Sequence, residues 1–399
     1  MLALFLKTVY RLLDDSSFQE SIGRASSNAR QGVDRALKTH PWIVKLASKV
    51  KEEEDHVLEN LEYFIEKAMK ALEKNGAGAY FASSAEQALE IIDELTEGSS
   101  LIVMSKSMAA EEIGLREHLE SRGKEVWETD LGQFLVQLEK GRPMHTIAPA
   151  IHISRKKARE LVSKVADNPE NDRPEAIARA ARVFLRQKIL KADTGITGAN
   201  SLAADTGSIV LVENEGNIRL VSGTVEHHIA IVPVDKIMPT IRTAVDAALV
   251  QAAYAGIFPP TYINIISGPS STADIEHKRV LGAQGPRRLD VVLLDNGRLR
   301  AVRDPLLRTQ LRCIRCGRCQ FECPVWEKLA NHWGGGVYGG PMGLNWTAIV
   351  QDERLASELA FYCLGCGRCS QVCPVEIPLD EIIRGLKRKL WKMEDSRHS

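Results

Sequence analysis

The spacing of apolar residues alternates between helical and strand-like patterns in the middle of the chain. Between residues 56 and 74, apolar side chains recur every three or four positions, which predicts a helix that ends at an Asn-Gly pair. A short strand is expected at residues 79–82, and residues 101–104 form the continuous apolar run of a strand buried on both faces. A further helix is expected over residues 109–122. This alternation predicts a parallel α/β layer.

The alternation continues to residue 294. Helical spacing recurs over residues 155–166, 174–191 and 239–253. Continuous apolar runs predict buried strands at residues 208–212, 229–232, 262–266 and 290–294. We interpret residues 218–221 as the hairpin partner of the strand at 208–212, or as a neighbouring strand, because a turn rich in Glu, Asn and Gly precedes them.

The two ends of the chain differ from this middle part. Residues 1–55 are charged and helical in pattern, with a break near residues 14–17, and we expect a helical arm that packs on the main body or on a partner. The cysteines lie close to the C-terminus. We therefore expect an N-terminal helical arm at 1–55, an α/β domain at 56–300 and a cysteine-containing domain at 301–399.

Charge and hydropathy exclude two classes of function. Lys and Arg together number 52, as do Asp and Glu, so the formal net charge is zero. A nucleic-acid binder that relies on a global positive field is therefore not expected. The sequence has no apolar run of about eighteen residues, so we expect no transmembrane segment and only peripheral membrane association through partners.

The clearest chemical signal is a pair of cysteine runs, each of the form C-x2-C-x2-C-x3-C-P, which together contain all eight cysteines. Ferredoxin-type domains hold [4Fe–4S] clusters with this spacing, because thiolate is the soft ligand that cluster iron requires. The fourth cysteine of each run binds the cluster of the other run. The rule assigns one cluster to Cys313, Cys316, Cys319 and Cys373. It assigns the second cluster to Cys323, Cys363, Cys366 and Cys369.

Two other interpretations of the cysteines are weaker. Disulfide frameworks are typical of short secreted chains, whereas this chain has 399 residues and confines its cysteines to two runs. Two zinc sites with four cysteine ligands each are chemically reasonable. The duplicated run with its terminal proline is more typical of iron–sulfur cubanes. Because thiols and clusters suit a reducing compartment, we expect a cytoplasmic location.

The segment between Cys323 and Cys363 is too long for a compact bacterial ferredoxin hairpin and contains a helical pattern at residues 345–359, so a mostly α-helical dicluster domain is expected. Basic residues beside the cysteines are expected to raise the reduction potential or dock an acidic partner, unless they are only solvated: Arg312, Arg315, Arg318 and Arg368. Large aromatic residues are expected to pack in the core, cover the clusters or face a partner: Trp326, Trp333, Tyr338 and Trp346.

Polar loops flank several predicted strands. The strand at 101–104 runs into Ser105-Lys106-Ser107, and open α/β sheets bind ligands beyond the carboxyl ends of their strands. If such loops converge on one side they form a polar pocket, although turns and helix caps have the same composition. The candidate pocket residues are Lys106, Thr206, Gly207, Ser267, Ser270, Thr272 and Asp274. A carboxylate nucleophile at Glu213 or Glu215 is an alternative to the preferred interpretation of a simple turn.

Several of these segments resemble LUD-domain iron–sulfur proteins of lactate utilisation. The resemblance covers nearly the whole chain from about residue 50. The segments that carry it are residues 105–108, 128–132, 196–199, 205–207 and 266–276, together with both cysteine runs.

The resemblance implies an α/β LUD domain of the NagB/RpiA/CoA-transferase type, with a mainly parallel sheet and flanking helices, followed by a helical ferredoxin domain with two [4Fe–4S] clusters. It also implies an electron-transfer subunit, rather than a stand-alone enzyme, in a multi-protein system that oxidises L-lactate to pyruvate. The implied partners are a CCG-domain protein and a second LUD protein. The alternatives are electron transfer for another dehydrogenase or a heterodisulfide-reductase-like complex, an acyl- or CoA-transferring enzyme, and a scaffold that senses a metabolite.

Overall fold

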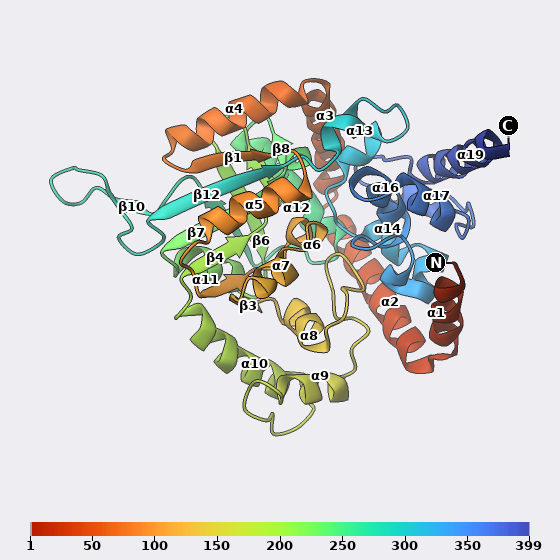
Figure 1. Cartoon of the computed structure of the whole chain (residues 1–399), viewed down its shortest axis with the longest axis horizontal. Coiled ribbons are helices and arrows are strands. Elements are labelled where there is room, and N and C mark those ends of the chain that lie inside the picture. The colour runs from red at the N-terminus through yellow and green to blue at the C-terminus, as the bar shows by residue number, and fades with distance from the viewer. Residues whose placement is uncertain (1, 399) are drawn as a thin grey trace.

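The computed structural model describes the backbone of residues 2–398 and the side chains of residues 5–391 (Figure 1). Within these residues, the largest sheet has six strands, all parallel, in the order β1-β12-β7-β4-β2-β3. The strands are β1 (Gly78–Ala82), β2 (Leu101–Met104), β3 (Glu125–Glu128), β4 (Thr194–Thr197), β7 (His227–Pro233) and β12 (Arg288–Leu294). The predicted parallel α/β layer is confirmed.

Helices cover both faces of this sheet. In β7, Ile229 and Ile231 belong to one apolar cluster, whereas Ala230 and Val232 belong to the main core on the other face. Alternate residues of one strand thus serve two separate apolar layers, as expected for a parallel sheet buried on both sides. The first face is covered by α5 (Ala85–Leu95) and α7 (Leu115–Ser121), and the second by α4 (Leu61–Lys74), α10 (Pro174–Ile189) and α11 (Asn217–Gly223).

A second, mixed sheet has the order β8-β5-β6-β9 within the described chain. Its strand β6 is antiparallel to both neighbours, and α12 (Ile241–Tyr254) packs against it. A short ribbon, β10–β11, extends away from the body at the left of Figure 1. The strands are β5 (Ser201–Ala203), β6 (Ser208–Glu213), β8 (Ile237–Met238), β9 (Tyr262–Ile266), β10 (Ser271–Thr272) and β11 (Val280–Leu281).

The prediction of a strand at residues 218–221 is wrong, because these residues lie in helix α11. Gly216 turns the chain with a φ of 78° just before the helix. The Glu213 carboxylate then accepts the backbone N–H groups of Ile218 at 2.8 Å and Arg219 at 3.2 Å, which satisfies donors at the helix start. The free edge of β6 pairs instead with β9, which lies about fifty residues further along the chain.

Two predicted helices are each interrupted. The segment at 56–74 spans the end of α3 (Trp42–Glu59) and all of α4, with a break at Asn60. The segment at 109–122 consists of α6 (Met108–Glu112) and α7, separated at Gly114, where φ is 64°. Apolar periodicity did not reveal either break, because the segments before and after it face the same core. The helices α8 (Leu131–Glu139) and α9 (Arg155–Val162) follow.

The N-terminal helices connect the α/β domain to the cysteine-containing region. The break predicted at residues 14–17 separates α1 (Leu2–Asp14) from α2 (Ser16–Thr39), and the Asp15 side chain caps α2 by accepting the N–H of Phe18 at 2.9 Å. Helix α2 contacts α12 as well as two helices of the cysteine-containing region. Helix α3 runs through residue 55, so the expected domain boundary falls within a helix.

The C-terminal region is mostly helical, as predicted. The helix expected at 345–359 is two helices, because Asp352 begins a new one by capping the N–H of Arg354 at 2.7 Å. The aromatic residues Trp326, Trp333, Tyr338 and Trp346 are at most 1% exposed, so they are core residues. Among the described residues, no helix combines the length and apolar character that crossing a membrane requires. The region's longer helices are α15 (Pro324–Leu329), α16 (Gly340–Val350), α17 (Glu353–Ala360) and α19 (Leu379–His398).

Candidate functional site

The two cysteine runs have the same local fold. In each run a left-handed glycine, Gly317 with φ 74° or Gly367 with φ 70°, leads into a four-residue helix that carries the third cysteine. Only glycine adopts this backbone conformation without a steric cost. These short helices are α14 (Arg318–Phe321) and α18 (Arg368–Gln371), and they contact each other.

The structure gathers the cysteines into two groups, each drawn from both runs. One cavity is lined by three cysteines of the first run and by the last cysteine of the second run. This inner set is Cys313, Cys316, Cys319 and Cys373. Another cavity is lined by three cysteines of the second run and by the last cysteine of the first run. This outer set is Cys323, Cys363, Cys366 and Cys369. The spacing rule predicts the same division of ligands between two clusters.

The thiol chemistry of both sets fits iron–sulfur clusters. Burial raises the pKa of Cys316 and Cys319 in the inner set. Burial also raises the pKa of Cys373, and of Cys323 and Cys369 in the outer set, to about 12. A thiol in such surroundings becomes a thiolate only beside a strong positive charge, and cluster iron supplies that charge.

Backbone amides also point at sulfur in both sets. The N–H of Ile377 donates to Cys373 Sγ, and the N–H of Gly365 donates to Cys363 Sγ, both at 3.4 Å. Such bonds stabilise negative thiolates and help to set cluster potentials. Within the described residues, no three Cys, His or carboxylate side chains converge closely enough for a single metal ion. A cubane needs no such convergence, because each of its irons takes a separate thiolate.

The loop of the inner set is tied to the α/β domain by buried charges. Asp235, just beyond β7, accepts from Arg315 Nη1 at 2.8 Å and pairs with Lys236 at 3.0 Å and with Arg298. Lys236 in turn donates to the backbone carbonyl of Cys313. Burial alone would raise the pKa of Asp235, but the three cations hold that pKa below its ordinary value. The carboxylate therefore stays ionised between the two domains.

A second carboxylate extends this network. Glu112 accepts two hydrogen bonds from Arg298, both at 2.8 Å, and a third from the Tyr338 hydroxyl at 2.8 Å. Arg298 and Glu112 come from the α/β side, whereas Tyr338 belongs to the cysteine-containing region. Paired, hydrogen-bonded charges of this kind fix the relative position of the two domains more than they add stability.

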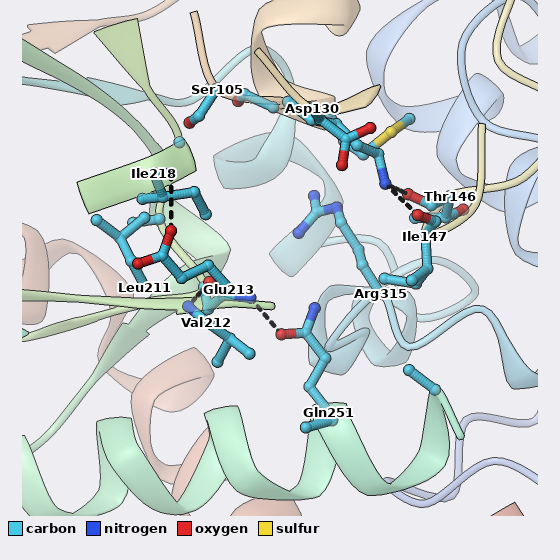
Figure 2. Close-up of a pocket in the computed structure, with 18 of the residues that line it drawn as sticks. Ser105, Asp130, Thr146, Ile147, Leu211, Val212, Glu213, Ile218, Gln251 and Arg315 are labelled. Atoms are coloured by element: carbon cyan, nitrogen blue, oxygen red, sulfur yellow. Dashed lines mark hydrogen bonds between the residues drawn. The ribbon is translucent and has the colours of Figure 1, made fainter. Parts of the chain in front are cut away.

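A cavity of about 420 Å³ lies beyond the carboxyl ends of β2, β6 and β7 (Figure 2). Figure 2 shows Arg315 entering from the cysteine-containing region, opposite Leu211 and Glu213, with Gln251 pointing up from α12. The lining also includes Ser105, Lys106, Asp130, Asn200 and Glu215. This is the edge where open α/β sheets bind their ligands.

The structure places the candidate pocket residues at two opposite ends of the second sheet. Lys106 lines the cavity, but the other six residues are not among the described residues that surround it. Ser267, at the end of β9, bonds to Ser208 at the start of β6, because these strands are antiparallel. The prediction was that the loops flanking the strands converge on one side. The residues placed elsewhere are Thr206 and Gly207 before β6, Ser267 after β9, and Ser270, Thr272 and Asp274 near the β10–β11 ribbon.

Titratable side chains meet in the cavity wall. Lys106 Nζ donates to the backbone carbonyls of Thr146 and Ile147, the latter at 2.8 Å. Burial lowers the pKa of Lys106, and carboxylates, Asp130 first among them, oppose this shift. Burial, followed by the charge of Asp130, raises the pKa of Glu215 to about 7. Near neutral pH, Glu215 is therefore partly protonated.

The two candidate nucleophiles are in different environments. Glu213 accepts from the backbone of α11, from Asn264 Nδ2 at 2.9 Å and from Arg219 Nε at 3.2 Å, so both of its oxygens are engaged in structural bonds. Glu215 accepts the N–H of Leu131 at 3.2 Å and still lines the cavity. Sequence reasoning did not place Asp130 or Gln251 in the site, because each approaches it from a different, distant segment.

Two family models match different parts of the chain. Residues 65–294 match the LUD domain, and residues 309–377 match a 4Fe-4S dicluster domain. Lactate utilization protein B from Bacillus velezensis is 34% identical over 389 residues, which cover 96% of this chain and 79% of the relative. The protein of the same name from Bacillus subtilis is 35% identical over 332 residues, which cover 82% and 67% of the two chains.

Two further proteins are similar to this chain. An uncharacterized electron transport protein of Escherichia coli is 31% identical over 387 residues, covering 95% of this chain and 78% of the relative. A crystal structure of a DUF162 family protein from Deinococcus radiodurans has a TM-score of 0.32 and 18% identity, covering 59% of this chain and 98% of that one. On the domain matches and the identity to the Bacillus proteins, this chain belongs to the LUD-domain family and carries a 4Fe–4S dicluster domain after the LUD domain.

Proposed function

We propose that this protein is an electron-transfer subunit that holds two [4Fe–4S] clusters and serves the oxidation of L-lactate to pyruvate together with partner proteins. The observation that carries the proposal is the gathering of eight cysteines into two four-cysteine cavities, each completed by a residue of the other run. When bound, such clusters take up and release single electrons. The chain's own residues hold the two cavities side by side, because α14 of one run contacts α18 of the other.

The lactate part of the proposal is supported by the relatives. Proteins named Lactate utilization protein B match this chain over most of its length, at 34% and 35% identity. We propose that the protein works in the cytoplasm within a multi-protein system. The partners that the family resemblance implies are a CCG-domain protein and a second LUD protein.

Anaerobic reconstitution with iron and sulfide tests the cluster part. We expect about eight irons per chain and two interacting [4Fe–4S] signals in electron paramagnetic resonance (EPR) after reduction. Fewer than about six irons per chain would contradict two cubanes.

Electron delivery from lactate is tested separately. The protein reconstituted with its clusters is mixed anaerobically with its purified partner proteins and L-lactate. Cluster reduction is then followed by EPR. D-lactate serves as the matched control. Clusters that stay oxidised with L-lactate, although dithionite reduces them, would remove lactate as the donor and leave the electron-transfer role in place.

A further inference from the structure

Arg315 connects the LUD-domain cavity with the inner cysteine set. Arg315 is a lining residue of the 420 Å³ cavity and also of the cavity of the inner set. It lies between Cys313 and Cys316 in the sequence, so its backbone forms part of the loop that carries the inner set. A single buried residue therefore borders both cavities.

The backbone of Arg315 is strained. Its φ is 56°, in the left-handed region that non-glycine residues rarely adopt. The guanidinium is held by Asp235 at 2.8 and 3.4 Å and lies over the Trp346 ring, 4.4 Å from its centre. Strain of this kind persists where surrounding contacts enforce it, and it is concentrated at functional sites.

Hydrogen-bonding capacity remains unused in the cavity wall. Among the described residues, Arg315 Nε and Ser105 Oγ are buried and have no partner. The Gln251 carbonyl oxygen accepts from Asn200, which leaves the Gln251 amide nitrogen able to donate. Buried polar groups normally find a partner, so unpartnered polar atoms on residues that line the cavity support the binding of a polar molecule there.

The charge of the cavity favours an anion with a single charge. Three basic residues line the cavity, Lys106, Lys236 and Arg315, together with three carboxyl groups, Asp130, Glu213 and Glu215. Burial raises the pKa of Glu215 to about 7, so its negative charge is only partly present at neutral pH. The small positive excess suits one carboxylate, whereas a polyphosphate would remain unbalanced in a buried site.

We propose that this cavity binds a short organic monocarboxylate with a neighbouring keto or hydroxyl oxygen, and that Arg315 transmits its binding to the inner cluster by lowering the cluster's reduction potential. The inference rests on the proposed function in one respect, because it needs a cluster in the inner set. The direction of the effect follows from charge. An anion beside Arg315 offsets part of the positive field at the inner set, so adding an electron there becomes less favourable.

The effect must be reciprocal. If the carboxylate lowers the potential, then it binds the protein with an oxidised inner cluster more tightly than the protein with a reduced one. We expect about a tenfold difference in affinity, within the usual range for coupled sites, which corresponds to about 59 mV for a one-electron couple. A donor that binds best when the acceptor is ready to be reduced is favourable for electron transfer.

The test is an EPR-monitored redox titration of the loaded protein, with calorimetry to measure binding. The probes are pyruvate, acetate and inorganic phosphate. Pyruvate carries a carboxylate and a keto oxygen, acetate lacks the second oxygen, and phosphate has a different anionic shape. We expect pyruvate to bind and to lower the potential of the inner cluster. Acetate is expected to bind more weakly, and the outer cluster is expected to stay unchanged.

Three variants test whether Arg315 carries the effect of pyruvate binding to the inner cluster. Arg315→Gln is expected to lower the inner potential in the absence of any probe and to abolish the pyruvate-dependent shift. Arg318→Gln is the matched control, because Arg318 is equally buried in the same loop but pairs with Glu322 at 2.8 Å and does not line the LUD-domain cavity. It should retain the shift. Lys106→Met lies outside the cluster cavity and should weaken pyruvate binding with full iron content.

The outcomes separate this inference from the proposed function. Low iron in the unmodified protein would count against the clusters themselves. With about eight irons present, an unchanged inner potential in saturating pyruvate would overturn the inference. A shift that survives in Arg315→Gln would also overturn it, and so would an equal shift of both clusters. Phosphate acting as strongly as pyruvate would refute the monocarboxylate class. If Arg315→Gln does not load clusters, unaltered pyruvate binding in Lys106→Met would refute the site.

Discussion

The inner and outer cysteine sets have the same sequence pattern and local fold but different surroundings. In the inner set Cys313, Cys316 and Cys319 are each 8% exposed, and the loop that carries them is tied to the LUD domain through Asp235. In the outer set Cys366 is exposed. A short motif therefore specifies a metal-binding loop but not its electrostatic environment, which depends on the domain packed against it.

Exposed apolar side chains lie on the helices and the loop of the outer set. The apolar side chains Phe361, Leu364 and Trp391 are exposed by 47%, 71% and 65%. Lys387, on the same helix as Trp391, donates to the backbone carbonyl of Cys363 at 2.9 Å. The outer set therefore lies near exposed apolar side chains, whereas the inner set lies against the LUD domain.

The largest expected effect is on iron content, and it tests whether the last cysteine of each run binds the cluster of the other run. Cys373→Ala is expected to remove the inner cluster even though Cys373 lies in the second run, because its side chain lines the inner cavity. Iron should fall from about eight to about four per chain. The matched variant Cys366→Ala should remove the outer cluster and spare the inner one. The EPR signals of the two variants identify which cluster remains, and loss of the outer signal in Cys373→Ala would refute the grouping.

Removal of the interdomain carboxylate should affect the inner set more than the outer. Asp235→Ala leaves Arg298 and Arg315 buried without their shared partner, which typically costs about 3–5 kcal/mol. Anaerobic denaturant unfolding measures this loss. The control is Glu62→Ala, because Glu62 pairs with Arg303 at an exposed site where solvent screens the charges. Equal losses in the two variants would show that the buried network has no special role.

The next largest expected difference between the inner and outer sets is their sensitivity to air. Oxidation follows access to the sulfur atoms, and Cys366 is open to solvent whereas the inner loop is covered. We expect the outer EPR signal to decay several-fold faster than the inner one in aerated buffer. If both EPR signals decay at the same rate in the unmodified protein, the inferred difference in solvent access between the two sets is wrong.

The smallest expected effect is the pH dependence of pyruvate binding beside the inner set. Burial and the charge of Asp130 raise the pKa of Glu215 to about 7, so Glu215 is neutral below that pH and negative above it. The added negative charge repels a carboxylate, so affinity should fall several-fold between about pH 6 and about pH 8. Calorimetry on Glu215→Gln should show a flatter profile. An affinity that rises with pH would contradict the assignment.

Many local features of the fold could be predicted from the sequence. The run at 101–104 matches β2, and the break at residues 14–17 matches the end of α1. Such features depend on neighbouring residues and on periodicity within a single element. The helix breaks at Asn60 and Gly114 were missed, because the apolar period continues across them.

The site was harder to predict than the fold. Lys106 follows a buried strand directly, so its place at the sheet edge could be inferred from the local pattern. Thr206 and Ser267 have the same polar character, yet they lie at the other end of β6: Thr206 precedes β6, and Ser267 joins it there because β9 is antiparallel to β6. The sequence did not show the direction of a strand relative to a partner so far along the chain.

The sequence alone predicted the chemistry of the cysteines, because the cysteines of each run lie within eleven residues of one another and their spacing is a local property. Tertiary structure alone decided which cluster loop lies against the LUD domain and that Arg315 borders both cavities. The physical reason is that Asp235, Glu112 and Tyr338 come from distant parts of the chain. The field at the inner set is a sum over charges that only the folded chain brings together.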